Sequence, residues 1–373
     1  MNLLNRLGRR LGPLTGALGA ALLPSRTQVG YVGLASGYNT HNLGDALMLP
    51  IFARELAPLR LHHSMMYRPI EHSVWKWACR RAFRACILGG GTLVFWQAFL
   101  DYFRVALDAG VPCYVLGTGV LDPDFWDRRQ PEFVAGRSQW KDALNSCRFV
   151  GVRGEASRQT LSELGVRNVS VVGDPSLLLA GSGLSRTCVH TPPVLGLNWG
   201  TAYGVLWGDD EVEPRRALAT AATHLANNGW RLRIYCVWPN DRKAVDDFTA
   251  LLPARSWSLA EHYLCARDFI RDVSGCTVFA GMKLHSTALA LCANVPSIML
   301  AYRPKCEEFM RSVGLEELCV RVDTLSGKAL ASTLLETAER WPALRSTFMT
   351  ATDALQGSLR SAMAMVTEQA GVQ

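Results

Sequence analysis

The sequence of 373 residues lacks the cysteine patterns that mark a disulfide framework or a zinc site. It holds 11 cysteines, an odd number, and no two of them form a Cys-x-x-Cys pair. Most stand singly in apolar segments, as Cys86, Cys113 and Cys292 do. This pattern is typical of buried thiols in a reducing compartment, because a small secreted domain would place its cysteines in bridges. We therefore expect a cytoplasmic protein.

Long hydrophobic runs and clustered basic residues are also missing. Beyond the N-terminus, no stretch has the 18 or more uncharged apolar residues that indicate a transmembrane helix. The formal net charge is +7, but Lys and Arg are scattered, and no basic run alternates with aromatic residues. We therefore expect anionic partners, such as an acidic metabolite or a membrane surface, and we do not expect a nucleic acid.

The remaining composition is that of a compact globular protein with two cores. Only 19% of the residues are charged and 49% are hydrophobic. A chain of this length exceeds one ordinary core and suits two domains of about 150 to 180 residues each. Residues 1–28 form an N-terminal tail, in which Arg6, Arg9 and Arg10 precede an apolar run with three glycines and a proline. We favour an amphipathic tail in peripheral contact with a membrane, and an export signal is the alternative.

Apolar strands and amphipathic helices alternate from Val29 onward, which predicts an α/β fold with parallel, doubly wound sheets. Glycine, serine and paired prolines at 180–193 break this rhythm and predict a domain boundary. We therefore predict two Rossmann-like domains, 29–185 and 186–345, that face a cleft, with a C-terminal helix over 346–373. The expected strands are 29–34, 60–63, 85–91, 113–119, 149–153, 169–175, 194–199, 231–237, 277–280 and 297–301. The expected late helices are 260–272, 328–340 and 343–369.

The strongest signal for a binding site lies in the second half of the chain. Lys283 and His285 stand where the expected helix 284–292 begins, and Lys305 follows the expected strand 297–301. A helix start presents unpaired N–H groups and partial positive charge, so cations added there make an anion site. Loops after neighbouring parallel strands meet at one edge of a sheet, which should bring these three side chains together. A helix cap or a surface role is the alternative for His285 taken alone.

A polar loop follows the first expected strand and contains Asn42, Gly44 and Asp45. Glycine permits a close backbone approach to a ligand, and an aspartate can accept the proton of a hydroxyl. A turn followed by a helix cap explains the same residues without a ligand. We place this loop on the N-terminal domain, on the side of the predicted cleft where a second ligand would enter.

Two further strand ends in the first half carry candidate residues. Gly89, Gly90 and Gly91 could let the backbone lie against a phosphate or a sugar, although close packing explains a triple glycine equally well. Arg153 ends a strand just before an acidic helix start. Its guanidinium could form a fork to a carboxylate or phosphate, and a surface ion pair is the alternative.

Together, these segments resemble the polysaccharide pyruvyl transferase family. The resemblance covers about Val29 to Gly314 and rests on the order and spacing of NLGD, LGGGT, VGVRGEASRQTLSELGV, VVGDPSLLL and KLHSTALALCANVPSIMLAYRPK. It implies a two-domain fold like that of GT-B glycosyltransferases. It also implies transfer of the pyruvyl group of phosphoenolpyruvate onto two hydroxyls of one sugar, as a cyclic ketal. The acceptor would be a sugar of an exopolysaccharide, capsule or cell-surface glycan precursor, and whether it is lipid-linked stays open.

The resemblance also implies roles for single residues. Arg153 matches the arginine that holds phosphoenolpyruvate, His285 the histidine of the family's Arg-x-His motif, and Lys305 a lysine that meets the donor. Position 283 departs from the motif, because lysine keeps the charge of arginine but not its bidentate fork. We expect phosphoenolpyruvate as a co-substrate, and neither a metal nor another cofactor, because these cations can neutralise it and no His-rich cluster accompanies them.

The chemistry of ketal formation needs an acid and a base. A group that titrates near neutrality suits proton delivery to the enol methylene, which makes His285 the candidate acid; a purely electrostatic role as a protonated phosphate ligand is the alternative. Asp45 is the candidate base for the attacking hydroxyl, because we place it on the domain opposite His285. Asp174 is the other carboxylate considered as the base, and a structural cap is the alternative for this residue.

Two rival functions come from the same sequence. A GT-B glycosyltransferase would need a carboxylate for the ribose of a nucleotide sugar, for which the candidates are Glu307, Glu308, Glu316 and Glu317. The second rival is a non-catalytic scaffold of polysaccharide assembly, for which replacing Arg153, His285 and Lys305 would leave the composition of the polymer unchanged.

Overall fold

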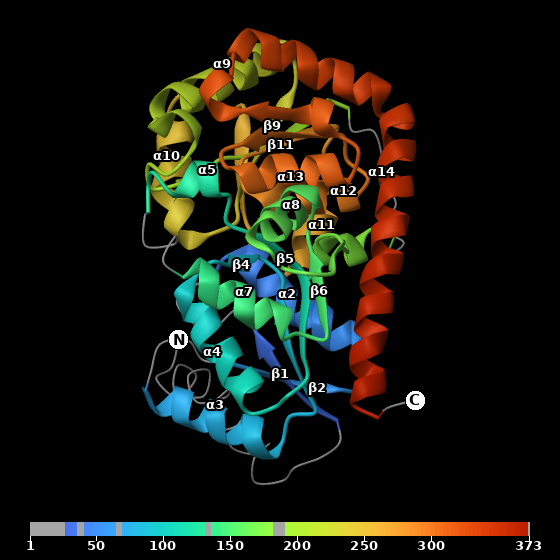
Figure 1. The fold of residues 1–373 in the computed structure, drawn as a ribbon. Helices are drawn as coiled ribbons and strands as arrows, with labels where there is room; N and C mark the ends of the chain where they lie inside the picture. Colours follow the sequence, from blue (N-terminus) through green and yellow to red (C-terminus); the bar gives the residue numbers. More distant parts are fainter. Residues whose placement is uncertain (1–26, 36–40, 65–68, 131–135, 182–190, 372–373) are drawn as a thin grey trace, which may run out of the picture. The chain divides into compact units, whose positions relative to one another are not determined.

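The computed structural model describes residues 27–35, 41–64, 69–130, 136–181 and 191–371, so the predicted tail lies almost entirely outside the described residues. The chain divides into two compact units (Figure 1). The first comprises residues 1–40, 48–175 and 354–373, and the second comprises residues 41–47 and 176–353. Residues 41–47, which we placed in the N-terminal domain, therefore pack with the second unit. No described helix is long and apolar enough to span a membrane.

The first unit is built on a seven-stranded sheet in the order β2-β1-β3-β5-β6-β7, with β4 beside β5, and all its pairs are parallel. Every residue of β1, β3 and β5 is buried, as expected for apolar runs covered on both faces. The chain reverses its direction across the sheet between β1 and β3. The strands are β1 (Gln28–Val32), β2 (Arg60–His63), β3 (Ala85–Gly89), β4 (Thr92–Val94), β5 (Cys113–Val120), β6 (Phe149–Val152) and β7 (Val169–Val171).

Amphipathic helices cover this sheet, with α4 against β1 and β3 and α8 against β5, β6 and β7. The end of α8 shows how the sequence stops a helix: Gly165 adopts φ +90°, a left-handed conformation that glycine reaches without a steric penalty. The helices are the part of α2 (Leu43–Glu55) from residue 48 onward, α3 (Pro69–Arg81), α4 (Gln97–Asp108), α5 (Pro123–Trp126), α7 (Arg137–Asn145) and α8 (Glu155–Leu164).

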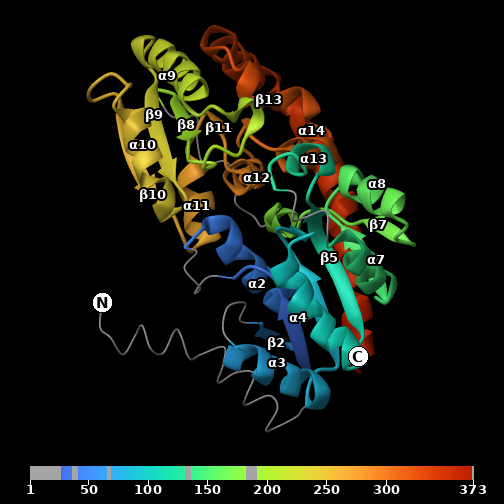
Figure 2. The same cartoon turned by 60° about the vertical axis from the view of Figure 1, so that its left-hand side comes forward.

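The second unit is built on a six-stranded parallel sheet in the order β10-β9-β8-β11-β12-β13. Figure 2 shows β8, β9 and β10 side by side. The chain reverses between β8 and β11, and in such sheets ligands bind outside the carboxyl ends of the strands at that reversal. The strands are β8 (Val194–Asn198), β9 (Arg231–Cys236), β10 (Trp257–Glu261), β11 (Val278–Gly281), β12 (Ser297–Ala301) and β13 (Cys319–Arg321).

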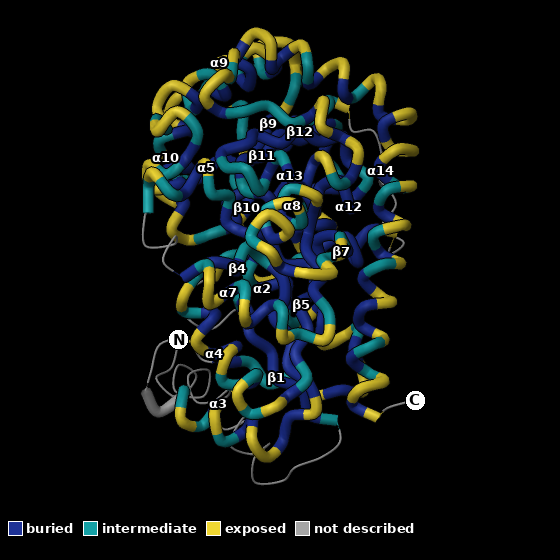
Figure 3. Tube along the Cα trace, in the orientation of Figure 1, coloured by how far each residue is buried: buried dark blue, intermediate teal, exposed yellow. Residues whose placement is uncertain are grey.

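The helices of the second unit pack on this sheet through buried apolar faces, while their outer turns are exposed (Figure 3). They are α9 (Val212–Asn227), α10 (Arg242–Thr249), α11 (Ala266–Val273), α12 (Leu284–Cys292), α13 (Pro304–Ser312) and the first part of α14 (Gly327–Gln369). Short 3-10 helices complete the chain at η1 (Pro175–Leu179), η2 (Trp207–Asp209), η3 (Pro239–Asp241), η4 (Glu316–Leu318) and η5 (Val322–Thr324).

Two expected helical segments differ from the structure. The prediction of a helix over 260–272 is wrong, because 257–261 is the edge strand β10 and only 266–273 is helical. Edge strands bury one face at most, so their apolar pattern is weak. The expected helices 328–340 and 343–369 are one continuous helix, α14, with Pro342 inside it. The predicted C-terminal helix over 346–373 is the later part of α14, which ends at Gln369.

Both units show the parallel, doubly wound arrangement, which confirms the predicted α/β class with two Rossmann-like domains. The predicted boundary at 180–193 lies mostly in residues 182–190, outside the described residues.

Candidate functional site

The start of α12 lies at the reversal point of the second sheet, directly after β11. Asn198, the fully buried last residue of β8, holds this start in place. Its side-chain oxygen accepts hydrogen bonds from the backbone N–H of Lys283 (3.0 Å) and from the hydroxyl of Ser286 (2.9 Å). Its amide nitrogen donates to the carbonyl of Tyr235 (2.8 Å). The sequence analysis did not select Asn198, although an asparagine at the end of an otherwise apolar strand is a usable signal.

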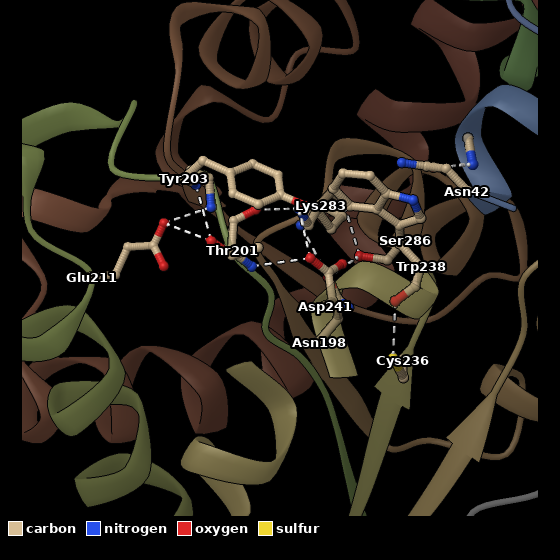
Figure 4. Close-up of polar contacts among 12 residues, drawn as sticks. Asn42, Asn198, Thr201, Tyr203, Glu211, Cys236, Trp238, Asp241, Lys283 and Ser286 are labelled. Atoms are coloured by element: carbon tan, nitrogen blue, oxygen red, sulfur yellow. Dashed lines mark hydrogen bonds and ion pairs between the residues drawn. The ribbon is translucent and has the colours of Figure 1, made fainter. Parts of the chain in front are cut away.

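Lys283 is bound to a buried carboxylate of the same unit (Figure 4). Its Nζ donates to the carbonyl of Thr201 at 2.7 Å and lies 3.0 Å from Oδ1 of Asp241, whose side chain is 0% exposed. Burial raises the pKa of Asp241, and the charge of Lys283 opposes that rise. Gly200 makes this contact feasible, because a Cβ there would lie 2.5 Å from Cε of Lys283. The lysine charge is thus largely committed to Asp241, which sequence reasoning missed since the two residues are far apart in the chain.

Asp45 and His285 belong to one cluster in the second unit. Asp45 lies in the first turn of α2 and is half-buried. Burial raises its pKa from 3.8 to about 6, while the positive charges of His285, Lys305 and Lys283 act in the opposite direction. Gly44 lies against the imidazole, because a Cβ at this position would overlap Nδ1 of His285. We predicted Asp45 on the domain opposite His285. This prediction is wrong, because both residues belong to the second unit and lie near each other.

Asn42 and the backbone after it fasten this turn of α2. Oδ1 of Asn42 accepts the N–H of Gly44 at 2.8 Å, and its carbonyl accepts the N–H of Ala46 at 2.9 Å. The N–H of Leu43 donates to the carbonyl of Val237, directly after β9, at 3.0 Å. Asn42 therefore caps the helix, which was the alternative to a ligand contact, and it holds Asp45 beside His285.

Lys305 lies in the first turn of α13, after β12, with Nζ 5.0 Å from the centroid of the Tyr302 ring. Arg303 lies against the same ring at 5.0 Å and donates from Nε to the carbonyl of Val205 (2.8 Å). The neighbouring strands β11 and β12 thus bring Lys283, His285 and Lys305 to one edge of the sheet, as the sequence predicted.

Arg153 lies in the first unit and is buried, with a 1% exposed side chain. Its Nη1 lies 3.4 Å from the carbonyl oxygen of Gly91, 3.3 Å from the hydroxyl of Thr92 and 4.0 Å from Oδ2 of the fully buried Asp174. The alternative of a surface ion pair is therefore wrong. A guanidinium buried among oxygen acceptors, with a carboxylate nearby, is held in a fixed orientation.

A sequence model of the polysaccharide pyruvyl transferase family matches residues 42–304. This match spans the loop of Asp45, the buried Arg153 and the start of α12. The chain belongs to the polysaccharide pyruvyl transferase family. No curated protein sequence matches the chain.

Solved structures share the fold of this family member at low sequence identity. A UDP-glucosyltransferase from Polygonum tinctorium is 16% identical with a TM-score of 0.56, and the match covers 94% of this chain and all of that one. A UDP-GlcNAc 2-epimerase from Neisseria meningitidis is 12% identical with a TM-score of 0.57, covering 92% and 99%. The UDP-bound MnaA of S. aureus is 10% identical with a TM-score of 0.59, covering 91% and 95%. The chain thus has the fold of GT-B glycosyltransferases and epimerases.

Gly89, Gly90 and Gly91 are closely packed against side chains of the first unit. A Cβ at Gly89 would lie 2.7 Å from the ring of Phe52, and one at Gly90 would lie 2.6 Å from Sδ of Met48. Gly90 and Gly91 also have positive φ, +71° and +65°. Close packing and the left-handed turn therefore account for these residues, and a contact with a sugar or phosphate stays a prediction.

The carboxylates considered for a nucleotide sugar are spread over different surroundings. Glu308 is buried and Glu317 pairs with Arg340 at 3.0 Å, while Glu307 is half-buried in the first turn of α13. Glu316 is exposed in η4. Among the residues that the structure describes, no group of three or more His, Cys, Asp or Glu side chains is arranged to hold a metal ion.

Proposed function

We propose that this protein transfers the pyruvyl group of phosphoenolpyruvate onto two hydroxyls of one sugar, in a precursor of an exopolysaccharide, capsule or cell-surface glycan. The proposal is carried by one observation: a family member places a carboxylate with a raised pKa, Asp45, beside His285 and Lys305 at a helix start. Binding of the phosphoenolpyruvate anion requires cations, and the transfer requires an acid and a base, for which we propose His285 and Asp45. Phosphoenolpyruvate acts as co-substrate, no resident cofactor is needed, and the reaction takes place in the cytoplasm, with peripheral membrane contact if the acceptor is lipid-linked.

Donor binding is proposed to use the cations at the starts of α12 and α13. Phosphoenolpyruvate carries close to three negative charges, which Lys305 and His285 would neutralise together with the N-terminal end of α12. The donor contact that the family resemblance implies for Arg153 stays a prediction. Lys283 contributes less charge than the sequence implied, because Asp241 lies 3.0 Å from its Nζ. We therefore assign Lys283 mainly to positioning the helix start and only secondarily to the donor.

The transfer begins with proton delivery from His285 to C3 of phosphoenolpyruvate, which leaves C2 electrophilic. A sugar hydroxyl adds to C2, the bond from C2 to the phosphate oxygen breaks, and the second hydroxyl of the same sugar closes the ketal. Of the two hydroxyl protons, one replaces the proton given to C3 and the other leaves with inorganic phosphate. The charge also balances, since a trianion becomes one carboxylate and a hydrogen phosphate dianion.

Asp45 is proposed as the base that takes the hydroxyl proton. A pKa of about 6 keeps the group mostly ionised at neutral pH and still basic enough to accept a proton, which an ordinary surface aspartate with a pKa of 3.8 does less well. Since Asp45 lies beside His285, a proton taken from the sugar can return to the imidazole for the next turnover.

The test is incubation of the full-length protein with phosphoenolpyruvate and a panel of glycosides, followed by phosphate release and mass spectrometry of the sugar. We expect phosphate release that depends on the sugar and a product with the mass of a cyclic pyruvate ketal. In His285→Gln, turnover should fall by about 10²–10⁴-fold while phosphoenolpyruvate still binds. The matched control is His224→Gln, since His224 is an exposed histidine of the same unit, on α9, and should keep full turnover. Undiminished turnover in His285→Gln would refute the acid role.

A nucleotide-sugar glycosyltransferase is distinguished by competition. If UDP displaces bound phosphoenolpyruvate, or if UDP-sugars are consumed and phosphoenolpyruvate is not, the pyruvyl transfer proposal fails. Substituting Arg153, His285 and Lys305 together tests the scaffold alternative, which expects the polymer composition in cells to stay unchanged.

A further inference from the structure

Two aromatic side chains border the Lys283–Asp241 pair. Tyr203 lies in the loop between β8 and α9, and Trp238 follows β9. Their ring centroids are 5.8 Å apart with an interplanar angle of 84°, and Nζ of Lys283 lies 5.1 Å from the centroid of the Trp238 ring (Figure 4). An aromatic surface therefore adjoins the helix start to which we assign the donor.

Tyr203 is placed in a way that its own packing does not explain. Its side chain is 63% exposed, which is the largest exposure among the large exposed hydrophobic residues of the described chain. Its φ is +54°, in the left-handed region where a non-glycine side chain costs free energy. Residues in such conformations cluster at active sites and ligand contacts. An exposed aromatic ring in a strained backbone therefore points to a function outside the fold itself.

The backbone on both sides of Tyr203 is held by Glu211. Oε1 of this carboxylate accepts the N–H of Ala202 at 2.6 Å, the N–H of Gly204 at 3.2 Å and the hydroxyl of Thr201 at 3.1 Å. The N–H of Tyr203 donates to the same hydroxyl at 2.9 Å. The loop is therefore fastened although its ring is exposed, which lowers the entropy that binding a ligand would cost.

Two buried polar atoms near the aromatic pair have no hydrogen-bond partner among the described residues. They are the indole N–H of Trp238, a donor, and Oδ2 of Asp241, an acceptor on a fully buried side chain. Buried polar groups are rarely left without a partner in native proteins. A ligand rich in hydroxyls can both donate and accept, so it would satisfy either atom.

We propose that Tyr203 and Trp238 form the platform on which the pyranose ring of the acceptor stacks. A pyranose has an apolar C–H face that packs on an aromatic ring and a rim of hydroxyls that bind polar groups, a combination that matches this surface. The acceptor contacts predicted for Asn42 and Gly44, whose loop packs with the second unit, stay a prediction beside this platform. That the bound sugar is the acceptor rests on the proposed function, because Lys283 joins the platform to the donor side.

Saturation-transfer NMR on the full-length protein tests the platform directly. The probes are the methyl pyranosides of glucose, galactose and mannose, with uridine as the flat alternative, and calorimetry measures phosphoenolpyruvate binding separately. We expect saturation of ring C–H protons in at least one pyranoside. Tyr203→Ala should weaken that binding about tenfold, while Tyr203→Phe keeps it, because stacking needs the ring and not the hydroxyl. Leu264→Ala is the matched control, an exposed apolar side chain of the same unit.

The outcomes separate the platform from the proposed function. Unchanged saturation in Tyr203→Ala, no saturation of any pyranoside in the unaltered protein, or loss of uridine binding instead of sugar binding would each overturn the platform. Sugar binding that depends on Tyr203, without any binding of phosphoenolpyruvate, supports the platform and overturns pyruvyl transfer. Phosphoenolpyruvate binding should be equal in Tyr203→Ala and the unaltered protein.

Discussion

In both sheets the strand order reverses at one point, between β1 and β3 in the first and between β8 and β11 in the second. The residues at the carboxyl ends of these strands differ in their chemistry. In the first unit, Gly89 ends β3 and Gly90 follows it, and the backbone of these two residues packs against Phe52 and Met48. In the second unit, the reversal leads from β8 and β11 into Asn198 and Lys283, which belong to a network of amide, hydroxyl and charged groups. Close packing of side chains on glycine therefore shapes this edge in the first unit, and hydrogen bonds and an ion pair shape it in the second.

Each of these edges also holds a cation beside a buried carboxylate. Arg153 of the first unit lies 3.3 Å or more from each of the oxygen atoms described around Nη1, including 4.0 Å from Asp174. Lys283 of the second unit lies 2.7 Å from the carbonyl oxygen of Thr201 and 3.0 Å from Oδ1 of Asp241. Both cations are therefore held by oxygen acceptors of their own unit, and the buried carboxylate of Asp241 has Lys283 as its counter-ion. We therefore expect changes at Lys283 to act first on stability.

The largest effect is expected for Lys283→Met, which leaves the buried carboxylate of Asp241 without its counter-ion. The free energy of unfolding should fall by about 3–5 kcal/mol in urea unfolding followed by circular dichroism. The double variant Lys283→Met/Asp241→Asn should recover most of this loss, because asparagine can still accept the N–H of Thr201 and carries no charge. A cost below about 1 kcal/mol for the single variant would show that Lys283 is not tied into the fold.

A smaller effect is expected for Gly90→Ala in the first unit. Alanine there meets a φ of +71° and would lie 2.6 Å from Sδ of Met48, so we expect a loss of about 2–3 kcal/mol in the same urea experiment. Gly110→Ala is the matched control, since Gly110 also has a positive φ, +74°, but no atom within 4 Å of its added Cβ. The control should lose about 1 kcal/mol from backbone strain alone. Equal losses in the two variants would contradict close packing at this edge.

The smallest effect on stability, with the sharpest dependence on pH, is expected for Asp45→Asn. Burial raises the folded-state pKa of Asp45 to about 6, so the fold favours the protonated form, and this contribution is lost as the pH rises from 3.8 through about 6. Above pH 6, the variant should therefore be more stable than the unaltered protein by about 1 kcal/mol, a value reduced because the side chain is partly exposed. At pH 3.5 the two should unfold at the same urea concentration.

The same variant should lose activity while it gains stability. In the unaltered protein, kcat/KM should rise with pH through about 6 as Asp45 ionises, and Asp45→Asn should lack this limb. A limb that persists in the variant would assign the base to another group. Loss of activity combined with a gain in stability is what separates a catalytic carboxylate from the structural Asp241.

Most elements of the fold follow from local patterns in the sequence. The ranges of β2, β12 and α12 agree with the expected ones, because a buried strand and an amphipathic helix each require a periodicity that is visible in the residues themselves. The edge strand β10 was misread as part of a helix, because one exposed face removes most of that signal.

The sequence by itself determined which residue types stand at the strand ends: the family motifs name Arg153, His285 and Lys305 without any coordinates. The tertiary structure alone decided what each of them touches. It paired Lys283 with Asp241, buried Arg153 beside Asp174, and set Asp45 next to His285 within the second unit. The physical reason is that periodicity reports a residue's burial and its element. Neighbours far apart in the chain, and the pKa values they impose, depend on how the elements pack.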